Sequence, residues 1–176
     1  IETAKGGDST GMSGKGGHGI YSGGDLTISG ATIGKWKTVG KTKTPDTDTG
    51  ALGGTADAGP QGGRGIHSNG KIDITGGEIV NAKGGDGKVS SYSNSRGDGI
   101  YSAKTLTITD STIGNAQGGS GKNGGAGIYS GSALNISGKA FIQNAKGGDS
   151  IDGSGGDGIH SDGKLTISGQ AFIGKA

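Results

Sequence analysis

Apolar residues recur on a fixed schedule along this chain, separated by glycine and polar residues. A Gly-Ile-Tyr/His-Ser segment starts at five places: Gly19, Gly65, Gly99, Gly127 and Gly158. A Leu/Ile-x-Ile segment follows each one, and a third isoleucine lies five or six residues later. Alternation of this kind, in runs of three to five residues bounded by Gly, Asp and Ser, predicts short β-strands rather than helices.

The isoleucines form three columns of five residues when the repeats are aligned, and these columns hold 15 of the 18 isoleucines. The first column contains Ile20, Ile66, Ile100, Ile128 and Ile159. The second contains Ile28, Ile74, Ile108, Ile136 and Ile167, and the third contains Ile33, Ile79, Ile113, Ile142 and Ile173. Successive first-column residues are 46, 34, 28 and 31 positions apart, and this variation falls outside the columns. A fixed core with variable loops is typical of a solenoid.

The repeat predicts an all-β fold, a single-stranded parallel β-helix of about five coils with three short strands in each coil. Residues 1–176 are expected to form one domain, with an insertion loop at 35–50 between coils 1 and 2. A fourth apolar column holds Leu26, Ile72, Leu106, Leu134 and Leu165. Asn81, Asn115 and Asn144 each follow a third-column residue by two positions, so we expect a hydrogen-bonded asparagine ladder.

Composition alone is typical of disorder, because 45 of the 176 residues are glycine and few are large and apolar. The regular columns outweigh that signal. No apolar run approaches the roughly 18 residues of a membrane-spanning helix. The chain has no cysteine, and its net charge of +2 is far from that of a nucleic-acid-binding domain. We therefore expect neither membrane insertion nor nucleic-acid binding.

The pattern Gly-Ile-x-x, followed by Leu-Thr-Ile-x-x-x-x-Ile-x-Asn, resembles the repeats of right-handed parallel β-helices in the pectate-lyase-like superfamily. It is most similar to the Gly-Asp-Gly-Ile-His/Leu-Thr-Ile repeats of bacterial carbohydrate-binding β-helix surface proteins. The likeness covers nearly the whole chain and implies a right-handed coil. Because it concerns the fold, it carries little information about activity.

Aromatic rings follow the first-column isoleucines, at Tyr21, His67, Tyr101, Tyr129 and His160. If the isoleucines point inward, these rings project outward in one row. One interpretation is a glycan-binding face, because flat amphipathic rings can stack on sugars. The other is that the rings stack on one another along the solenoid. A second outward row distantly resembles the threonine arrays of ice-binding proteins, but aspartate and asparagine interrupt it: Thr27, Asp73, Thr107, Asn135 and Thr166.

The insertion carries the only tryptophan, Trp36, and four lysines. One interpretation is that Trp36 packs against the flank of the rod. The other is a contact loop for a partner or a polyanionic glycan, formed by Trp36, Lys35, Lys37 and Lys41. Tyr92, in a later loop, is a weaker candidate of the same kind.

Catalysis and metal binding have little support in the sequence. Gly155-Gly156-Asp157-Gly158 resembles a calcium-binding nonapeptide, but a period of nine does not fit coils of 28 or more residues. A polysaccharide lyase of this fold would need clustered carboxylates for calcium and a basic residue. The two arginines, Arg64 and Arg96, lie in glycine-rich loops without such a cluster. We therefore expect no enzymatic activity, no cofactor and no metal site.

Outward charges alternate with neutral residues along one column: Lys5, Leu52, Lys83, Gln117 and Lys146. Spacing like charges two coils apart lowers their repulsion. No capping elements are expected, so the chain is predicted either to belong to a longer repeat array or to stack head to tail with other copies. Stacking coil five on coil one would bring Lys146 beside Lys5 and break the alternation.

These observations favour a non-catalytic, extracellular or cell-surface β-solenoid with a structural and adhesive role, as a subunit of a surface fibre or filament. The alternative is a carbohydrate-binding module that binds surface polysaccharide through the Tyr/His column. Ice binding is a third and weaker interpretation.

Overall fold

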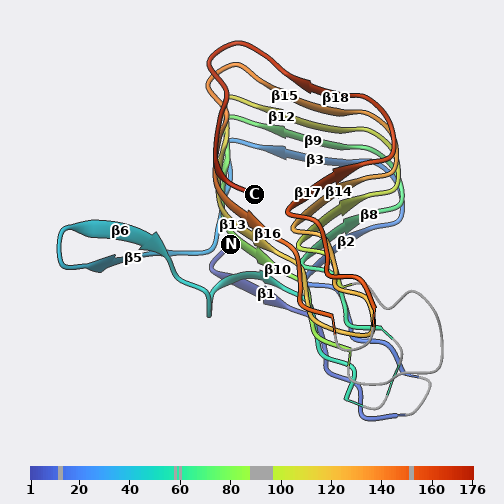
Figure 1. Ribbon diagram of the computed structural model, residues 1–176. Helices are drawn as coiled ribbons and strands as arrows, with labels where there is room; N and C mark the ends of the chain where they lie inside the picture. The colour runs from blue at the N-terminus through green and yellow to red at the C-terminus, as the bar shows by residue number, and fades with distance from the viewer. Residues whose placement is uncertain (12–13, 58, 60, 88–96, 151–152) are drawn as a thin grey trace.

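The computed structural model describes residues 1–176 except 12–13, 58, 60, 88–96 and 151–152. Within the described residues the secondary structure is entirely β, and the chain winds repeatedly through three parallel sheets (Figure 1). Each full coil contributes one strand to each sheet, and five such coils are present. The structure therefore confirms the predicted parallel β-helix.

The first sheet holds the Gly-Ile-Tyr/His-Ser segments, in β2 (Ile20–Ser22), β8 (Ile66–Ser68), β11 (Ile100–Ser102), β14 (Ile128–Ser130) and β17 (Ile159–Ser161). The second holds the Leu/Ile-x-Ile segments, in β3 (Leu26–Ser29), β9 (Ile72–Thr75), β12 (Leu106–Thr109), β15 (Leu134–Ser137) and β18 (Leu165–Ile167). The third contains β1 (Thr3–Lys5), β4 (Thr32–Ile33), β7 (Gly50–Leu52), β10 (Glu78–Lys83), β13 (Thr112–Gln117), β16 (Phe141–Lys146) and β19 (Phe172–Lys175).

The predicted isoleucine columns are in register within these sheets. In the first sheet, for example, Ile100 pairs with Ile66 on one side and with Ile128 on the other. Isoleucines of the middle coils are fully buried in the interior, where each contributes about 2 kcal/mol of burial free energy. The buried interior is therefore built from identical side chains stacked from coil to coil.

The third sheet has longer strands than the predicted three to five residues, because β10, β13 and β16 each contain six. These strands extend past the isoleucine column through the predicted asparagine ladder. The Asn115 Nδ2 donates to Asn81 Oδ1 at 2.8 Å, and the Asn144 Nδ2 donates to Asn115 Oδ1 at 2.6 Å. The side-chain amides thus form a hydrogen-bonded ladder from coil to coil, and the structure confirms the predicted stack of asparagines.

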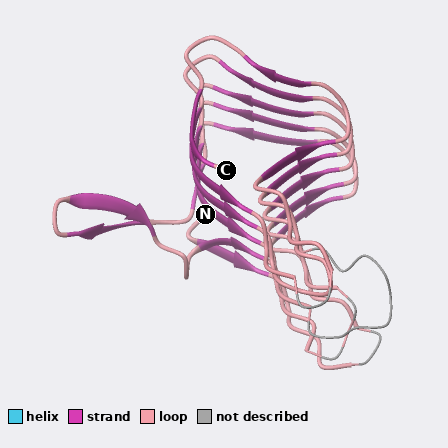
Figure 2. Cartoon of the chain, in the orientation of Figure 1, coloured by secondary structure: helices cyan, strands magenta, loops and turns pink. Residues whose placement is uncertain are grey.

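The insertion lies within a strand of the third sheet and folds as a β-hairpin. Ile33 in β4 pairs with Ile79, and Ala51 in β7 pairs with Ala82, so β4 and β7 are two halves of one strand. Between them β5 (Trp36–Val39) and β6 (Thr42–Pro45) pair in antiparallel fashion and project from the rod (Figure 2). Gly40 has a φ of 64°, which favours glycine in the tight turn.

Glycine-rich segments connect the third sheet to the first and stack on one another at the lower right of Figure 1. We call their described residues the glycine arm: 6–11, 14–19, 53–57, 59, 61–65, 84–87, 97–99, 118–127, 147–150 and 153–158. Its outgoing and returning limbs exchange backbone hydrogen bonds: the Gly17 amide donates to the Gly7 carbonyl, and the Gly54 amide donates to Gly17, both at 2.8 Å. A Cβ at Gly54 would overlap the Gly7 carbonyl, so only glycine permits this close approach.

Candidate functional site

The ring column, Tyr21, His67, Tyr101, Tyr129 and His160, is aligned residue to residue in the first sheet. The ring centroids of Tyr101 and Tyr129 lie 4.9 Å apart and those of Tyr129 and His160 lie 5.1 Å apart, with interplanar angles of 4°. The other face of Tyr101 meets the Arg64 guanidinium, whose Cζ is 3.6 Å from the ring centroid. Sugar stacking needs a free ring face, and neighbouring groups cover both faces of Tyr101.

A directed hydrogen-bond chain orders the N-terminal end of this column. The Arg64 backbone N–H donates to His18 Nδ1 at 2.9 Å, so the hydrogen of a neutral His18 lies on Nε2. That Nε2 is 2.9 Å from His67 Nδ1 and donates to it. His67 in turn donates through Nε2 to Asn69 Oδ1 at 3.0 Å, and Asn69 Nδ2 donates to the Tyr21 hydroxyl.

Burial and positive charge keep these two imidazoles neutral. Burial, followed by the nearby Arg64 charge, lowers the pKa of His67 to about 4. The pKa of His18 is also lowered, first by burial and then by Arg64 and Lys15. A proton added to either ring would place two N–H groups against each other or against a backbone donor. The pair is therefore a neutral structural element.

The C-terminal end of the column has the opposite electrostatics. His160 Nδ1 lies 2.7 Å from Asp157 Oδ2, and its Nε2 lies 2.9 Å from Asp162 Oδ1. Hydrogen bonds to Asp157 and Asp162 raise the pKa of His160. The Tyr129 hydroxyl donates to the other oxygen of Asp162, and this hydrogen bond raises the pKa of Tyr129 to about 12.

The hairpin spreads its predicted contact residues apart. Trp36 lies against the rod, where its Cη2 is 2.8 Å from the point that a Cβ on Gly114 would occupy. This packing matches the first interpretation of Trp36. Lys35 forms an ion pair with Glu2 at 2.6 Å and Lys37 lies 3.8 Å from Asp46, while Lys41 is exposed in the turn. The lysines therefore do not converge on one point.

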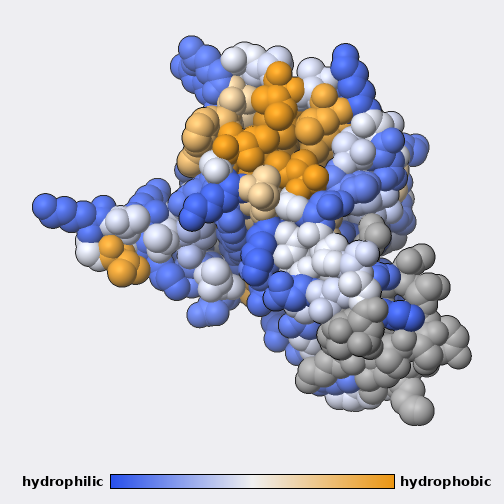
Figure 3. Space-filling model, in the orientation of Figure 1, coloured by the Kyte–Doolittle hydropathy of each residue, from blue (hydrophilic) through white to orange (hydrophobic). Residues whose placement is uncertain are grey.

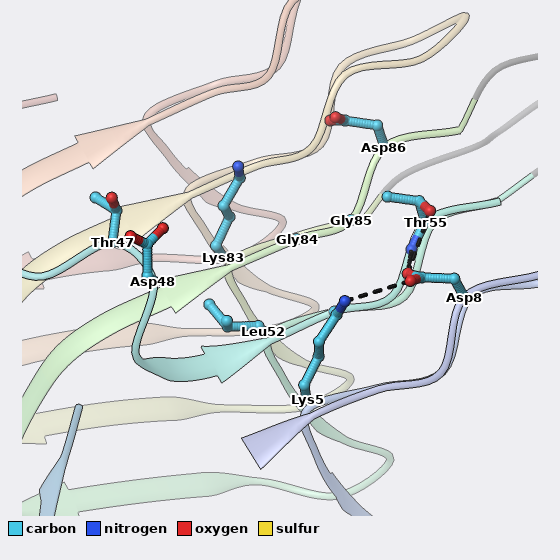
Figure 4. A pocket seen from close by; sticks show the side chains of 11 residues that line it. Lys5, Asp8, Thr47, Asp48, Leu52, Thr55, Lys83, Gly84, Gly85 and Asp86 are labelled. Atoms are coloured by element: carbon cyan, nitrogen blue, oxygen red, sulfur yellow. Dashed lines mark hydrogen bonds and ion pairs between the residues drawn. The ribbon is translucent and has the colours of Figure 1, made fainter. Parts of the chain in front are cut away.

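A polar groove of about 370 Å³ lies beside the outgoing limbs of the glycine arm (Figure 4). Leu52 forms part of its floor, between Lys5 and Lys83 of the neighbouring coils. Asp8 accepts hydrogen bonds from the Thr55 amide at 2.7 Å and from Lys5 at 3.3 Å, and these contacts lower the pKa of Asp8. Sequence reasoning identified these columns but not the hollow between them, which depends on how the arm leaves the sheet.

The last coil leaves the apolar columns open at the C-terminal end of the rod. Leu165 is 46 % exposed, Ile167 48 % and Phe172 60 %. Figure 3 shows an apolar surface at this end of the rod. Beside it, a hollow of about 660 Å³ lies at the end of the glycine arm, lined by residues that include Gly148, Gly156 and Ala176. This end combines exposed core side chains with strand edges that have no neighbour within the described residues.

Several predicted features stand apart from these sites. The second outward row is in register in the second sheet, with Thr107 between Asp73 and Asn135. Tyr92 and Arg96 lie outside the described residues.

Among the residues that the structure describes, no three His, Cys, Asp or Glu side chains gather so as to hold a metal ion. The same residues include no helix with the length and apolar character needed to cross a membrane.

No protein-family model, curated protein sequence or solved structure matches this chain.

Proposed function

We propose that this chain is a non-catalytic, structural and adhesive β-solenoid of the extracellular space or cell surface, and that copies associate end to end through the open C-terminal coil. The exposed apolar columns at that end carry the proposal. Leu165 and Ile167 are about half exposed, whereas their column mates Leu134 and Ile136 one coil earlier are fully buried.

A second copy is the occupant that fits this surface. Its first coil carries Leu26 and Ile28 in the same columns, and β3, with four residues, runs in the same direction within the second sheet as β18, with three. Pairing β18 with β3 of the next copy would continue both the backbone ladder and the apolar column. Such a head-to-tail contact does not close on itself, so it generates fibres.

Sedimentation and electron microscopy of the purified chain test this proposal. We expect linear oligomers that lengthen with concentration. A charge in the open columns, as in Leu165→Lys combined with Ile167→Lys, should abolish them, because it would bury unpaired ammonium groups at the junction. Val39→Lys is the matched control, since Val39 is 63 % exposed on the hairpin and lies away from the end. A chain that stays monomeric, or an end variant that assembles like the control, would reject the proposal.

Carbohydrate binding is the second candidate, supported by the polar groove and by the resemblance of the repeats to those of carbohydrate-binding β-helix surface proteins. The groove offers ammonium donors from Lys5 and Lys83 and a carboxylate from Asp48, groups that hydrogen-bond sugar hydroxyls. Binding on a glycan array should be lost in Lys83→Ala if the groove is the site. Loss in Tyr101→Ala, with Lys83→Ala still binding, would instead assign the glycan to the ring column.

A further inference from the structure

The outermost strands of the third sheet hold equivalent positions in the repeat. At one edge, the Ile1 ammonium donates to the Thr32 carbonyl at 2.8 Å and the Ile1 carbonyl accepts from the Gly34 amide at 2.9 Å, which pairs Ile1 with Ile33. At the other edge, Ile173 pairs with Ile142. By the same registers, Ala4 and Ala176 share the alanine column of Ala51 and Ala145. Residues 1–4 and 173–176 therefore fall in the same four columns.

Two copies cannot stack in register while both strands stay in place. When β17 and β18 pair with β2 and β3 of the next copy, β19 and the β1 of that next copy fall on the same edge of β16. If β1 instead pairs with β19, the first and second sheets are each left one strand short, a gap of about 4.8 Å beyond contact.

We infer that end-to-end association proceeds by strand exchange, in which β19 of one copy displaces β1 of the next and pairs with its β7. This inference rests on the proposed function. The amides of Gly34 and Gly50, which donate to the Ile1 and Glu2 carbonyls at 2.9 Å, would donate instead to Ile173 and Gly174 of the incoming strand. The exchange loses the Lys35–Glu2 ion pair, which is exposed and contributes little.

The hollow beside Ala176 matches the segment that follows β1. In the exchanged junction, Lys5 of the next copy continues from the position of Ala176, and its glycine arm enters the hollow lined by Gly148 and Gly156. Along the arm, the Gly148 amide donates to the returning limb of the previous coil at Gly125, at 2.8 Å. By the same pattern, the Gly156 carbonyl of one copy would accept a hydrogen bond from the Gly7 amide of the next copy. Neither has a backbone partner within the described residues.

Two glycines report specifically on this junction. A Cβ at Gly148 would overlap the Gly119 carbonyl, but a Cβ at Gly7, in the same column, meets nothing within 4 Å. In the exchanged junction Gly7 would face Gly148 of the preceding copy. Gly155 is the counterpart at the other end: the nearest atom to its Cβ is 3.8 Å away, whereas a Cβ at the equivalent Gly124 would overlap the Gly148 carbonyl.

The test compares assembly of the full chain with that of a chain lacking residues 1–4, using light scattering and electron microscopy. The truncated chain should assemble at a concentration lower by on the order of 10- to 1,000-fold, because β1 no longer occupies the edge that β19 needs. Gly7→Ala and Gly155→Ala should fold normally, with unchanged thermal unfolding of the monomer, and lose assembly. Thr38→Ala on the hairpin is the control.

Cysteine cross-linking identifies the strand that occupies the edge of β7, since the chain has no cysteine of its own. Ala176→Cys with Ala51→Cys should give disulfide-linked multimers, because neighbouring strands are close enough for a disulfide. Cross-linking of Ala176→Cys to Ala4→Cys instead would show β1 stacked on β19 and overturn the exchange. Full-length assembly that is insensitive to the truncation and to Gly7→Ala would also overturn it while leaving end-to-end association intact. Absence of assembly in every form would reject both.

Discussion

The two ends of the rod are made from the same repeat and yet present different surfaces. At the N-terminal end the second- and third-column residues Ile28 and Ile33 are 7 % and 2 % exposed, whereas at the C-terminal end Ile167 is 48 % exposed. β1 pairs along the N-terminal edge of the third sheet, and the carbonyls of Thr47 and Thr49, between β6 and β7, accept hydrogen bonds from Asn81 at the start of the asparagine ladder. The repeated residues therefore determine the packing of the solenoid's interior, and residues outside the repeat determine the surfaces at its ends.

The apolar columns should show the largest difference between the middle and the open end. Ile108→Ala, at a fully buried position, should cost about 3–4 kcal/mol of unfolding free energy, because it leaves a cavity between two coils. Ile167→Ala should cost about 1 kcal/mol, since half of that side chain is already in water. Urea unfolding of the two variants as monomers checks this. Equal losses would mean that the end coil is as well packed as the middle.

The glycine arm offers the next comparison. Gly54→Ala should destabilise the chain by about 1–3 kcal/mol or more, because its methyl group would overlap backbone atoms of Gly7 that cannot move aside. Gly7→Ala, in the same column at the N-terminal end, should leave monomer stability within about 0.5 kcal/mol of the wild type. Thermal unfolding at low protein concentration measures both. A tolerated Gly54→Ala would contradict the close approach of the limbs.

The asparagine ladder should distinguish an interior rung from its last rung. Asn115→Ala should cost about 2–3 kcal/mol, since it leaves Asn81 Oδ1 and Asn144 Nδ2 without their partner in a buried setting. Asn144→Ala should cost about 1 kcal/mol, because it removes one hydrogen bond at the more exposed rung. Denaturant midpoints of the two variants, with a substitution at Gln143 as the matched control, test whether Asn115→Ala is the more destabilising.

The two histidines of the ring column should give the smallest effects, with opposite pH dependence. His67 has a pKa of about 4 in the folded chain and about 6.5 when unfolded, so its contribution to stability is lost as pH falls from 6.5 towards 4. His160 has a raised pKa, so its contribution is present below pH 6.5 and is lost as pH rises through that raised value.

Melting temperatures of His67→Gln and His160→Gln, measured across pH 4–9, check the signs of these effects. His67→Gln should flatten the acid side of the stability profile, and His160→Gln the side above pH 6.5. The same slope change in both variants would contradict a lowered pKa for His67 at one end of the column and a raised pKa for His160 at the other.

The columns could be predicted from sequence because each carries its information in residue type and spacing. Ile20, Ile66 and Ile100 recur at matching offsets, and a period of two determines which side chains face inward. The asparagine ladder follows from the same alignment. Once the strands are stacked in register, residues that share an offset must lie side by side.

The glycine arm and the hairpin were harder to predict from the sequence, for a physical reason. The returning limb of the arm is visible as a second glycine pair, such as Gly16-Gly17 or Gly62-Gly63, but spacing does not tell which limb it packs against. The hairpin signal was Gly40 between alternating Lys and Thr, which is weak beside a strong repeat. His18 was missed because its contact with His67 depends on side-chain direction across two coils.

The interrupted strand shows that the solenoid accommodates an inserted segment without a change in strand register. The chain leaves the wall at Gly34 and re-enters at Gly50, with φ of 96° and 107°, and the pairing on either side continues as if nothing intervened. The corresponding step one coil later, between Val80 and Asn81, is uninterrupted within β10. A peptide inserted there between two glycines would project from the third sheet one coil away from the natural hairpin. Insertions in successive coils would therefore display peptides at spacings set by the distance between coils.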